Sequence, residues 1–195
     1  VVGAAEGLAK LVVQRLLAPV ASTPGLQLVC HEGPVDRLLA DLALHRLDLV
    51  LADRPAPPNP ALRLFSHALA GGAVAWYGVP ALAARARADH PAALARLPLL
   101  LPGPQTALRP LLERWFERHG LHPQPAGEFD DSALMKTFAA EGLGLFPACT
   151  LVEAALAARY GVERAGPCDG VEEGHWAIVA ERRVQHPLVQ RLLGG

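Results

Sequence analysis

The run Leu47–Ala52 is apolar at every position except Asp48. A run this short and continuous is typical of a parallel strand that helices cover on both faces. Parallel neighbours must be joined by crossovers, so the strand restricts the chain to folds in which strands and helices alternate. The preceding segments fit that alternation: a strand at Val1–Gly3, a helix with Leu8, Leu11, Val12 and Leu16 that Pro19 closes, a strand at Leu26–Cys30, and a helix from Gly33-Pro34 with Val35, Leu38, Leu39 and Leu42 on its buried stripe. This β-α-β-α-β order predicts an α/β fold with a doubly wound sheet and right-handed crossovers.

The alternation continues after a proline-rich loop over residues 53–60. The predicted elements are strands at Leu62–Leu69, Ala73–Tyr77, Leu99–Leu101, Leu143–Phe146 and Glu173–Arg182, and helices at Ala81–Leu97, Thr106–His119, the second half of Gly127–Ala140, Thr150–Arg159 and Pro187–Leu193. The last strand and helix lie far from the first set, so we expect two Rossmann-like lobes. Residues 1–70 with 174–195 form lobe I, and residues 71–173 form lobe II. In such proteins the ligand binds where carboxyl ends of strands from both lobes face each other.

The segment Gly127–Phe138 places two carboxylates where a strand gives way to a helix. Leu134 and Phe138 are one turn apart on one helix face, with apolar residues beside them. Asp130 and Asp131 stand at the start of the helix, where a side-chain oxygen accepts unpaired backbone N–H groups. These carboxylates therefore either only cap the helix or contact a ligand directly.

Composition excludes several classes of function. The 18 basic and 19 acidic residues nearly cancel, which argues against nucleic-acid binding by this chain alone. No apolar run approaches the ~18 residues that cross a bilayer. The odd number of widely spaced cysteines, 3, fits reduced thiols in a cytoplasmic protein. No serine lies in a Gly-x-Ser-x-Gly elbow and no glycine-rich phosphate loop follows a strand, so we expect neither an enzyme nor a bound cofactor.

Three motifs resemble the effector-binding domain of LysR-type transcriptional regulators. They are the strand entry His45–Val50, the helix pattern Leu108-Arg109, Leu112, Phe116 and Gly120, and the turn Ala140–Leu145, read Ala-Glu-Gly-Leu-Gly-Leu; Pro147 comes earlier than the proline usual after that strand. The resemblance covers essentially the whole chain. It implies two lobes of type II periplasmic-binding-protein topology joined by two crossover strands. It also implies an N-terminal winged helix-turn-helix, absent from this chain, that binds promoter DNA.

A narrower likeness is to those family members that activate sodium/proton antiporter transcription. It rests on Gly127–Phe138, Ala180-Glu181-Arg182, Gln185-His186-Pro187 and Val189-Gln190-Arg191. This likeness implies activation in response to sodium. It also implies a homodimer through the helices at Gly7–Ala18 and Thr106–His119, with a tetramer for the full-length protein.

The family resemblance implies an effector, a small molecule or an ion, bound between the lobes. The implied contacts are Ala4, Ala5, Glu6, Asp53, Arg54, Gln105, Thr106, Phe129, Asp130 and Asp131. Sodium needs hard oxygen ligands, for which Glu6, Asp130 and Asp131 are the candidates. Alternatively, the acids only cap helices and pair with Arg54 or Arg109. Two other functions stay open: a LysR-type domain that senses a small organic anion, and a two-lobed solute-binding protein of a transport system.

Overall fold

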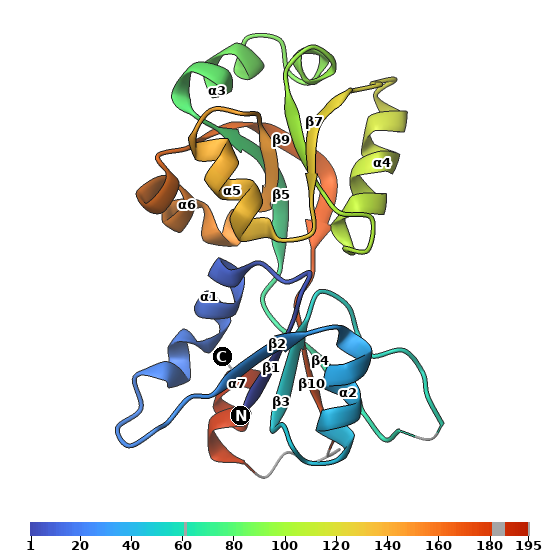
Figure 1. Cartoon of the computed structure of the whole chain (residues 1–195), viewed down its shortest axis with the longest axis vertical. Helices are drawn as coiled ribbons and strands as arrows, with labels where there is room; N and C mark the ends of the chain where they lie inside the picture. The colour runs from blue at the N-terminus through green and yellow to red at the C-terminus, as the bar shows by residue number, and fades with distance from the viewer. Residues whose placement is uncertain (61, 181–185, 195) are drawn as a thin grey trace. The chain divides into compact units, whose positions relative to one another are not determined.

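The computed structural model describes residues 1–60, 62–180 and 186–194. The chain forms two compact units (Figure 1). Unit 1 contains Val1–Ala70 and Gly174–Gly195, and unit 2 contains Gly71–Glu173. The chain passes between the two units twice. The sheet of each unit therefore pairs strands that are distant in sequence.

Unit 1 is built on a five-stranded sheet with the order β2-β1-β3-β10-β4. Its strands are β1 (Val2–Ala5), β2 (Cys30–Gly33), β3 (Leu49–Ala52), β4 (Phe65–Ala68) and β10 (Trp176–Val179). The first three are parallel, as the sequence predicts, and β10 runs antiparallel to both β3 and β4. The carboxyl ends of β1 and β3 therefore meet at one edge of the sheet, next to the start of β10.

Helices cover both faces of this sheet (Figure 1). They are α1 (Lys10–Ala21), α2 (Val35–Ala43) and α7 (Pro187–Leu193), and α1 packs against α7. The predicted stripe of α2 is confirmed, because Leu38, Leu39 and Leu42 are buried. Pro19 does not close α1 as expected. It lies inside the helix, in the last turn before Ala21, where the loss of its own N–H interrupts the helix only near its end.

Unit 2 contains an antiparallel sheet, β8-β5-β9, and a parallel pair, β6-β7. The strands are β5 (Gly72–Gly78), β6 (Leu99–Pro102), β7 (Pro125–Phe129), β8 (Phe146–Cys149) and β9 (Glu163–Glu173). The helices are α3 (Pro80–Arg87), α4 (Leu108–Arg118), α5 (Ser132–Ala140) and α6 (Glu153–Tyr160), with 3₁₀ turns η1 (Ala92–Ala95) and η2 (Thr150–Val152). No helix in the described ranges of either unit is long and apolar enough to cross a membrane.

An aromatic cluster fills the core of unit 2. Trp76 of β5 lies 6.4 Å from Trp115 and 5.7 Å from Phe116, measured between ring centroids. Both partners come from the apolar stripe predicted for α4, in which Leu108 and Leu112 are also buried. Gly120 has a φ of 62° and ends this helix in the left-handed conformation that glycine adopts without strain.

Three strand predictions are wrong in their boundaries or incomplete. β2 is Cys30–Gly33 rather than Leu26–Cys30, and β8 is Phe146–Cys149 rather than Leu143–Phe146. β2 is an edge strand with three of four residues exposed, so its hydrophobic pattern does not fix the register. The longest strand, β9, is absent from the sequence-based elements, because glycine, proline and charged residues interrupt it. Of the expected strand Glu173–Arg182, residues 181–182 lie outside the described ranges, as does Gln185.

Two helix predictions also need correction. The single helix expected over Ala81–Leu97 is α3 followed by η1, with Pro91 between them. On α5 the buried stripe is shifted by one residue from the expected face. Met135 and Ala139 are buried, whereas Leu134 is 51% and Phe138 43% exposed. Both columns of side chains are apolar, so periodicity alone cannot choose between them.

Gly144 lies where the chain passes from α5 to β8. A Cβ atom at this position would be 2.8 Å from the carbonyl oxygen of Pro98. The close approach lets the Leu145 N–H donate to Pro98 O at 2.9 Å, while the Leu100 N–H donates to Leu145 O at 2.7 Å. These bonds join the start of β8 to β6. The second glycine of the motif Ala140–Leu145 is therefore required for backbone contact.

We expect Gly144→Ala to lower the free energy of unfolding by about 1–3 kcal/mol, because the neighbour that must move is backbone. Gly33→Ala is the matched control, since a Cβ there meets no atom within 4 Å. Its effect should stay within about 1 kcal/mol of zero. Urea unfolding followed by circular dichroism measures both changes. Equal stability of Gly144→Ala and the wild type would contradict this role of Gly144.

Candidate functional site

In unit 1 the predicted site residues lie at the carboxyl ends of β1 and β3. Ala4 and Ala5 are the last residues of β1, and the side chain of Ala5 packs in the core with Leu38. Glu6 follows them with an exposed side chain, and its N–H donates to Gly33 O at 3.2 Å. The end of β1 therefore offers backbone groups and one carboxylate to a ligand.

Asp53 follows β3 directly and is only 8% exposed. The Arg54 guanidinium binds it through two hydrogen bonds, Nε to Oδ1 at 3.0 Å and Nη2 to Oδ2 at 3.3 Å. The side chain of Arg54 is 48% exposed, so part of this cation faces solvent. The alternative in which Asp53 pairs with Arg54 is thus the arrangement found.

A buried histidine completes this edge of the sheet and was missed by the sequence-based reasoning. His175 is 1% exposed and directly precedes β10. Burial lowers its pKa from the ordinary 6.5, and the nearby carboxylate of Asp53 opposes that effect. Sequence carries little signal for such a residue, because histidine is found both on surfaces and in cores.

In unit 2 the turn Gly103–Thr106 follows β6. The Thr106 hydroxyl donates to Gly103 O at 2.9 Å and accepts the Arg109 N–H at 3.4 Å. The N-cap position of α4 is Ala107, so Thr106 stabilises the turn before the helix rather than occupying the cap itself. Gln105 is exposed in the same turn. The Thr106 hydroxyl therefore links the two ends of this turn.

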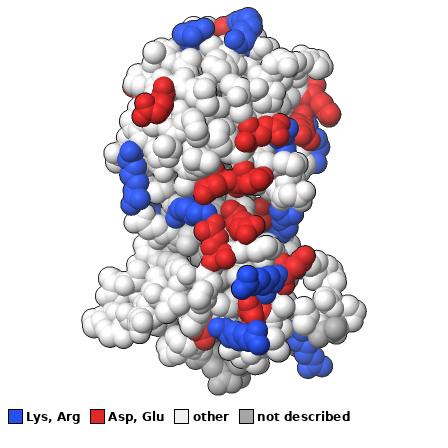
Figure 2. Space-filling model, in the orientation of Figure 1, with Lys and Arg blue, Asp and Glu red and all other residues white. Residues whose placement is uncertain are grey.

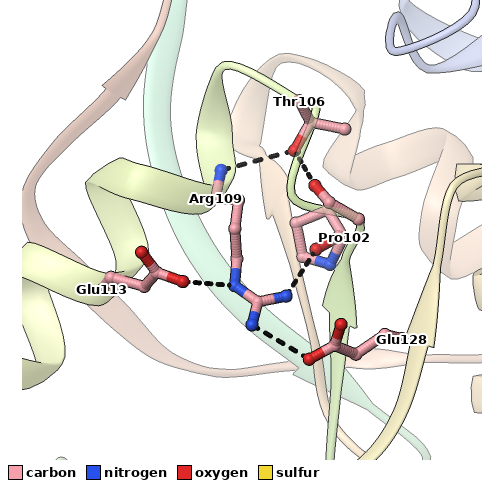
Figure 3. Close-up of polar contacts among 6 residues, drawn as sticks. Pro102, Thr106, Arg109, Glu113 and Glu128 are labelled. Carbon is pink, nitrogen blue, oxygen red and sulfur yellow. Dashed lines mark hydrogen bonds and ion pairs between the residues drawn. The ribbon is translucent and has the colours of Figure 1, made fainter.

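Arg109 anchors this turn from below (Figure 3). Its guanidinium donates to Pro102 O at 3.0 Å, to Glu113 Oε1 at 2.9 Å and to Glu128 Oε1 at 2.9 Å. Its side chain is only 15% exposed. The hydrogen bond to Glu128 raises the pKa of Arg109 most, with a further contribution from Glu113, while burial acts in the opposite direction. Arg109 thus ties the ends of β6 and β7 to α4.

Phe129, Asp130 and Asp131 continue from the end of β7 into α5. The Phe129 ring lies 5.5 Å from the Phe138 ring. The exposed Asp130 packs its carboxylate directly over Gly103, where a Cβ atom would collide with Oδ1. The Asp131 Oδ1 accepts the N–H groups of Ala133 at 2.6 Å and Leu134 at 3.4 Å. Asp131 is therefore the N-cap of α5, whereas Asp130 does not contribute to the cap.

The charges of these loops are mixed rather than of one sign. Basic and acidic side chains are interspersed over the face seen in Figure 2, as expected for a formal net charge of −1. Among the residues that the structure describes, no group of three or more His, Cys, Asp or Glu could hold a metal ion. The loops can therefore offer single carboxylates, one half-exposed guanidinium and backbone groups to a ligand.

Comparison with known proteins adds to this geometry. The family model described as LysR substrate binding domain matches residues 1–194. The chain is 36% identical over 193 residues to Transcriptional activator protein NhaR of Escherichia coli (strain K12), a match that covers 98% of this chain. The chain spans 63% of the length of that relative. Both of these matches are to transcriptional regulators and not to enzymes, as the sequence leads us to expect.

Solved structures share the fold at low identity. The regulatory domain of HypT from Salmonella typhimurium superposes with a TM-score of 0.71 at 15% identity, covering 99% of this chain and 92% of that one. Full-length CbnR in complex with its target DNA gives 0.73 at 16% identity, covering 99% and 67%. The α/β fold with type II periplasmic-binding-protein topology is thereby confirmed.

The capping role of Asp131 can be tested by stability. Asp131→Ala should lower the free energy of unfolding by about 1 kcal/mol, because two backbone N–H groups lose their acceptor. Asp131→Asn should cost much less, since asparagine caps helices nearly as well. Asp130→Ala is the neighbouring control and should be close to neutral. Chemical denaturation measures all three, and a larger loss for Asp130→Ala than for Asp131→Ala would contradict the assignment.

Proposed function

We propose, from the premise that this chain belongs to the LysR substrate-binding domain family, that it is the effector-sensing domain of a transcriptional regulator. The observation that carries the proposal is the match of one family model to residues 1–194, with 36% identity to an activator over nearly the same range. The chemistry of the loops supports it. They present groups that can bind and orient a ligand without reacting with it.

The finer proposal is that the regulator activates sodium/proton antiporter transcription in response to sodium. Its support is the identity with NhaR and the likeness over Gly127–Phe138. Sodium is a hard cation that takes carboxylate, carbonyl and water oxygens. In unit 2, Asp130 and Asp131 supply carboxylates, and Asp131 keeps its Oδ2 outside the hydrogen bonds of the helix cap. In unit 1, Glu6 supplies another.

The effector contacts follow from where parallel strands end. In unit 1 they are Ala4, Ala5, Glu6, Asp53 and Arg54, after β1 and β3. In unit 2 they are Gln105, Thr106, Phe129, Asp130 and Asp131, around the ends of β6 and β7. Ligands of open α/β sheets bind at the carboxyl ends of strands, which supports both sets.

Promoter DNA is bound through a separate N-terminal winged helix-turn-helix domain of a cytoplasmic protein. The support is twofold. The related CbnR structure contains its target DNA, and the present chain corresponds to 63% of the length of NhaR. The formal net charge of −1 on this chain leaves the attraction to phosphate to another part of the protein.

A small organic anion is the second candidate effector, and Arg54 is the observation that favours it. This guanidinium is 48% exposed and uses two of its donors on Asp53. Its planar fork suits a carboxylate. If an anion binds at this loop, Arg54→Gln should abolish its binding. If sodium binds at the aspartates, Arg54→Gln should leave sodium binding unchanged.

Isothermal titration calorimetry tests the sodium proposal. The wild type should release or absorb heat with sodium chloride beyond that with potassium chloride at equal ionic strength. The double variant Asp130→Asn with Asp131→Asn should lose that difference and keep the helix cap, because asparagine still accepts the N–H groups.

Asp36→Asn is the control, an exposed aspartate in the first turn of α2. It should titrate like the wild type. Equal heats for sodium and potassium in the wild type would remove the sodium proposal. A heat from potassium succinate that Arg54→Gln abolishes would favour the anion instead.

We also propose that the chain forms a homodimer in which α1 of one copy packs against α4 of the other. The support is the family resemblance together with the surface of α1. That surface exposes small side chains, Ala18 and Ala21, beside Pro19, which allow close approach of a second helix. In a two-fold dimer of this kind the α1–α4 contact occurs twice, and the assembly is closed at two copies.

Light scattering should give a mass of about twice the 20.6 kDa of the chain. Ala18→Glu should shift the population toward the monomer, because a carboxylate would be buried at the contact. Ala40→Glu is the control, another exposed alanine, on α2, and should leave the mass unchanged. A monomeric wild type at high micromolar concentration would contradict the dimer.

A further inference from the structure

His175 and Asp53 face each other across two neighbouring strands. β10 pairs antiparallel with β3 through Trp176↔Ala52, Ala177↔Leu51 and Ile178↔Val50. One further step of this register brings His175 opposite Asp53. Residues directly opposite in an antiparallel pair place their side chains on the same face of the sheet. A buried imidazole and a buried carboxylate are thus neighbours at the edge where β3 ends.

The His175 ring has no hydrogen-bond partner within the described ranges. Neither Nδ1 nor Nε2 reaches an acceptor or donor, although its backbone carbonyl accepts the Leu69 N–H at 2.8 Å. The backbone of Gly174 is near enough to favour the charged ring without meeting normal hydrogen-bond geometry. A buried polar group left unpaired is costly, and in native proteins such a group has a reason.

The ionisable groups near this end of the sheet come from two strands and one loop. Asp53 directly follows β3 and Arg54 follows Asp53, while β4 contributes His67, whose Nε2 is buried with no partner among the described residues. Asp53 is the charged group that acts on the His175 ring, and it favours protonation against the effect of burial. At neutral pH the ring is therefore uncharged, and the Asp53 carboxylate is held by Arg54.

We propose that His175 is a proton-dependent positioning residue for the Asp53–Arg54 loop. When the ring binds a proton, both of its nitrogens become donors, and the carboxylate of Asp53, opposite it in the register, is the acid whose charge acts on the ring. The protonated ring then competes with Arg54 for that carboxylate. Arg54 is 48% exposed, so part of its guanidinium already faces solvent and need not be buried when its bonds to Asp53 weaken.

The consequence is a link between protons and the charge that this loop presents. With His175 neutral, the loop shows a paired Asp53–Arg54 couple. With His175 protonated, it shows one more positive charge and a weakened Asp53–Arg54 pair. The link goes beyond the proposed function, because it concerns the free domain and holds whichever effector binds.

Nuclear magnetic resonance of the ¹⁵N-labelled chain tests this inference. The Arg54 Nε–H resonance should shift below pH 6.5 with the same midpoint as the His175 ring, which is identified by its absence from the spectrum of His175→Gln. In His175→Gln the Arg54 shift should be lost. In Asp53→Asn the His175 midpoint should move to lower pH, because the carboxylate that favours the charged ring is gone. His31→Gln, an exposed histidine of β2, should leave the Arg54 shift unchanged.

An Arg54 resonance that stays constant through the His175 titration would overturn the proposal, and so would a shift that persists in His175→Gln. The wild-type titration decides by itself if a variant does not fold. Neither outcome depends on sodium, so failure here is distinct from failure of the proposed effector.

Denaturation provides a second measurement with a definite sign. The folded-state pKa of His175 lies below the 6.5 of the unfolded chain, so the unfolded state takes up this proton first as pH falls. Stability present above pH 6.5 is therefore lost progressively toward the lower folded-state pKa. The His175→Gln variant should lack this part of the acid sensitivity, whereas His31→Gln should retain it. Identical pH dependence of stability in wild type and His175→Gln would count against a buried neutral ring.

Discussion

The guanidinium of Arg109 is the interaction on which the unit 2 loops depend. It is largely buried, and a buried charge is tolerated only when its hydrogen bonds are nearly all made. Here the acceptors come from the end of β6, from β7 and from α4 itself. A lysine could satisfy only part of this set, because its ammonium is a point charge without a planar fork. The mostly buried side chain of Arg109 thus helps to fix the position of the turn Gly103–Thr106.

Close packing of neighbouring groups explains two of the glycines in these loops. Gly103 leaves room for the Asp130 carboxylate, and Gly127 lies against the Phe129 ring, where a Cβ would come within 2.9 Å of Cε2. Close approach replaces side-chain bulk by backbone N–H and C=O groups. These strand ends therefore present backbone groups and a few charges, which can hold a ligand but supply no reactive group.

Sequence reasoning succeeds where one pattern has one physical meaning. The continuous run at β3 and the stripe of α4 both predict burial, and both are buried. It fails where the pattern is compatible with two structures: the exposed edge strand β2, the two apolar columns of α5, and β9, whose pairing with β5 is held by backbone bonds despite poor strand formers. His175 is the clearest omission at the site. A buried polar residue is defined by its tertiary neighbours, and no local spacing reports them.

The acids near these strand ends are mostly engaged by the fold itself. Glu128 is bound by Arg109, Asp53 by Arg54, and one oxygen of Asp131 by the start of α5. A cation that uses these carboxylates must compete with guanidinium or N–H donors for the same lone pairs. Competition of this kind lowers the affinity for the cation. It also means that cation binding would move the donors that it displaces. A sensor needs that second property, because a ligand shifts a conformational equilibrium only by its differential interaction with the two states.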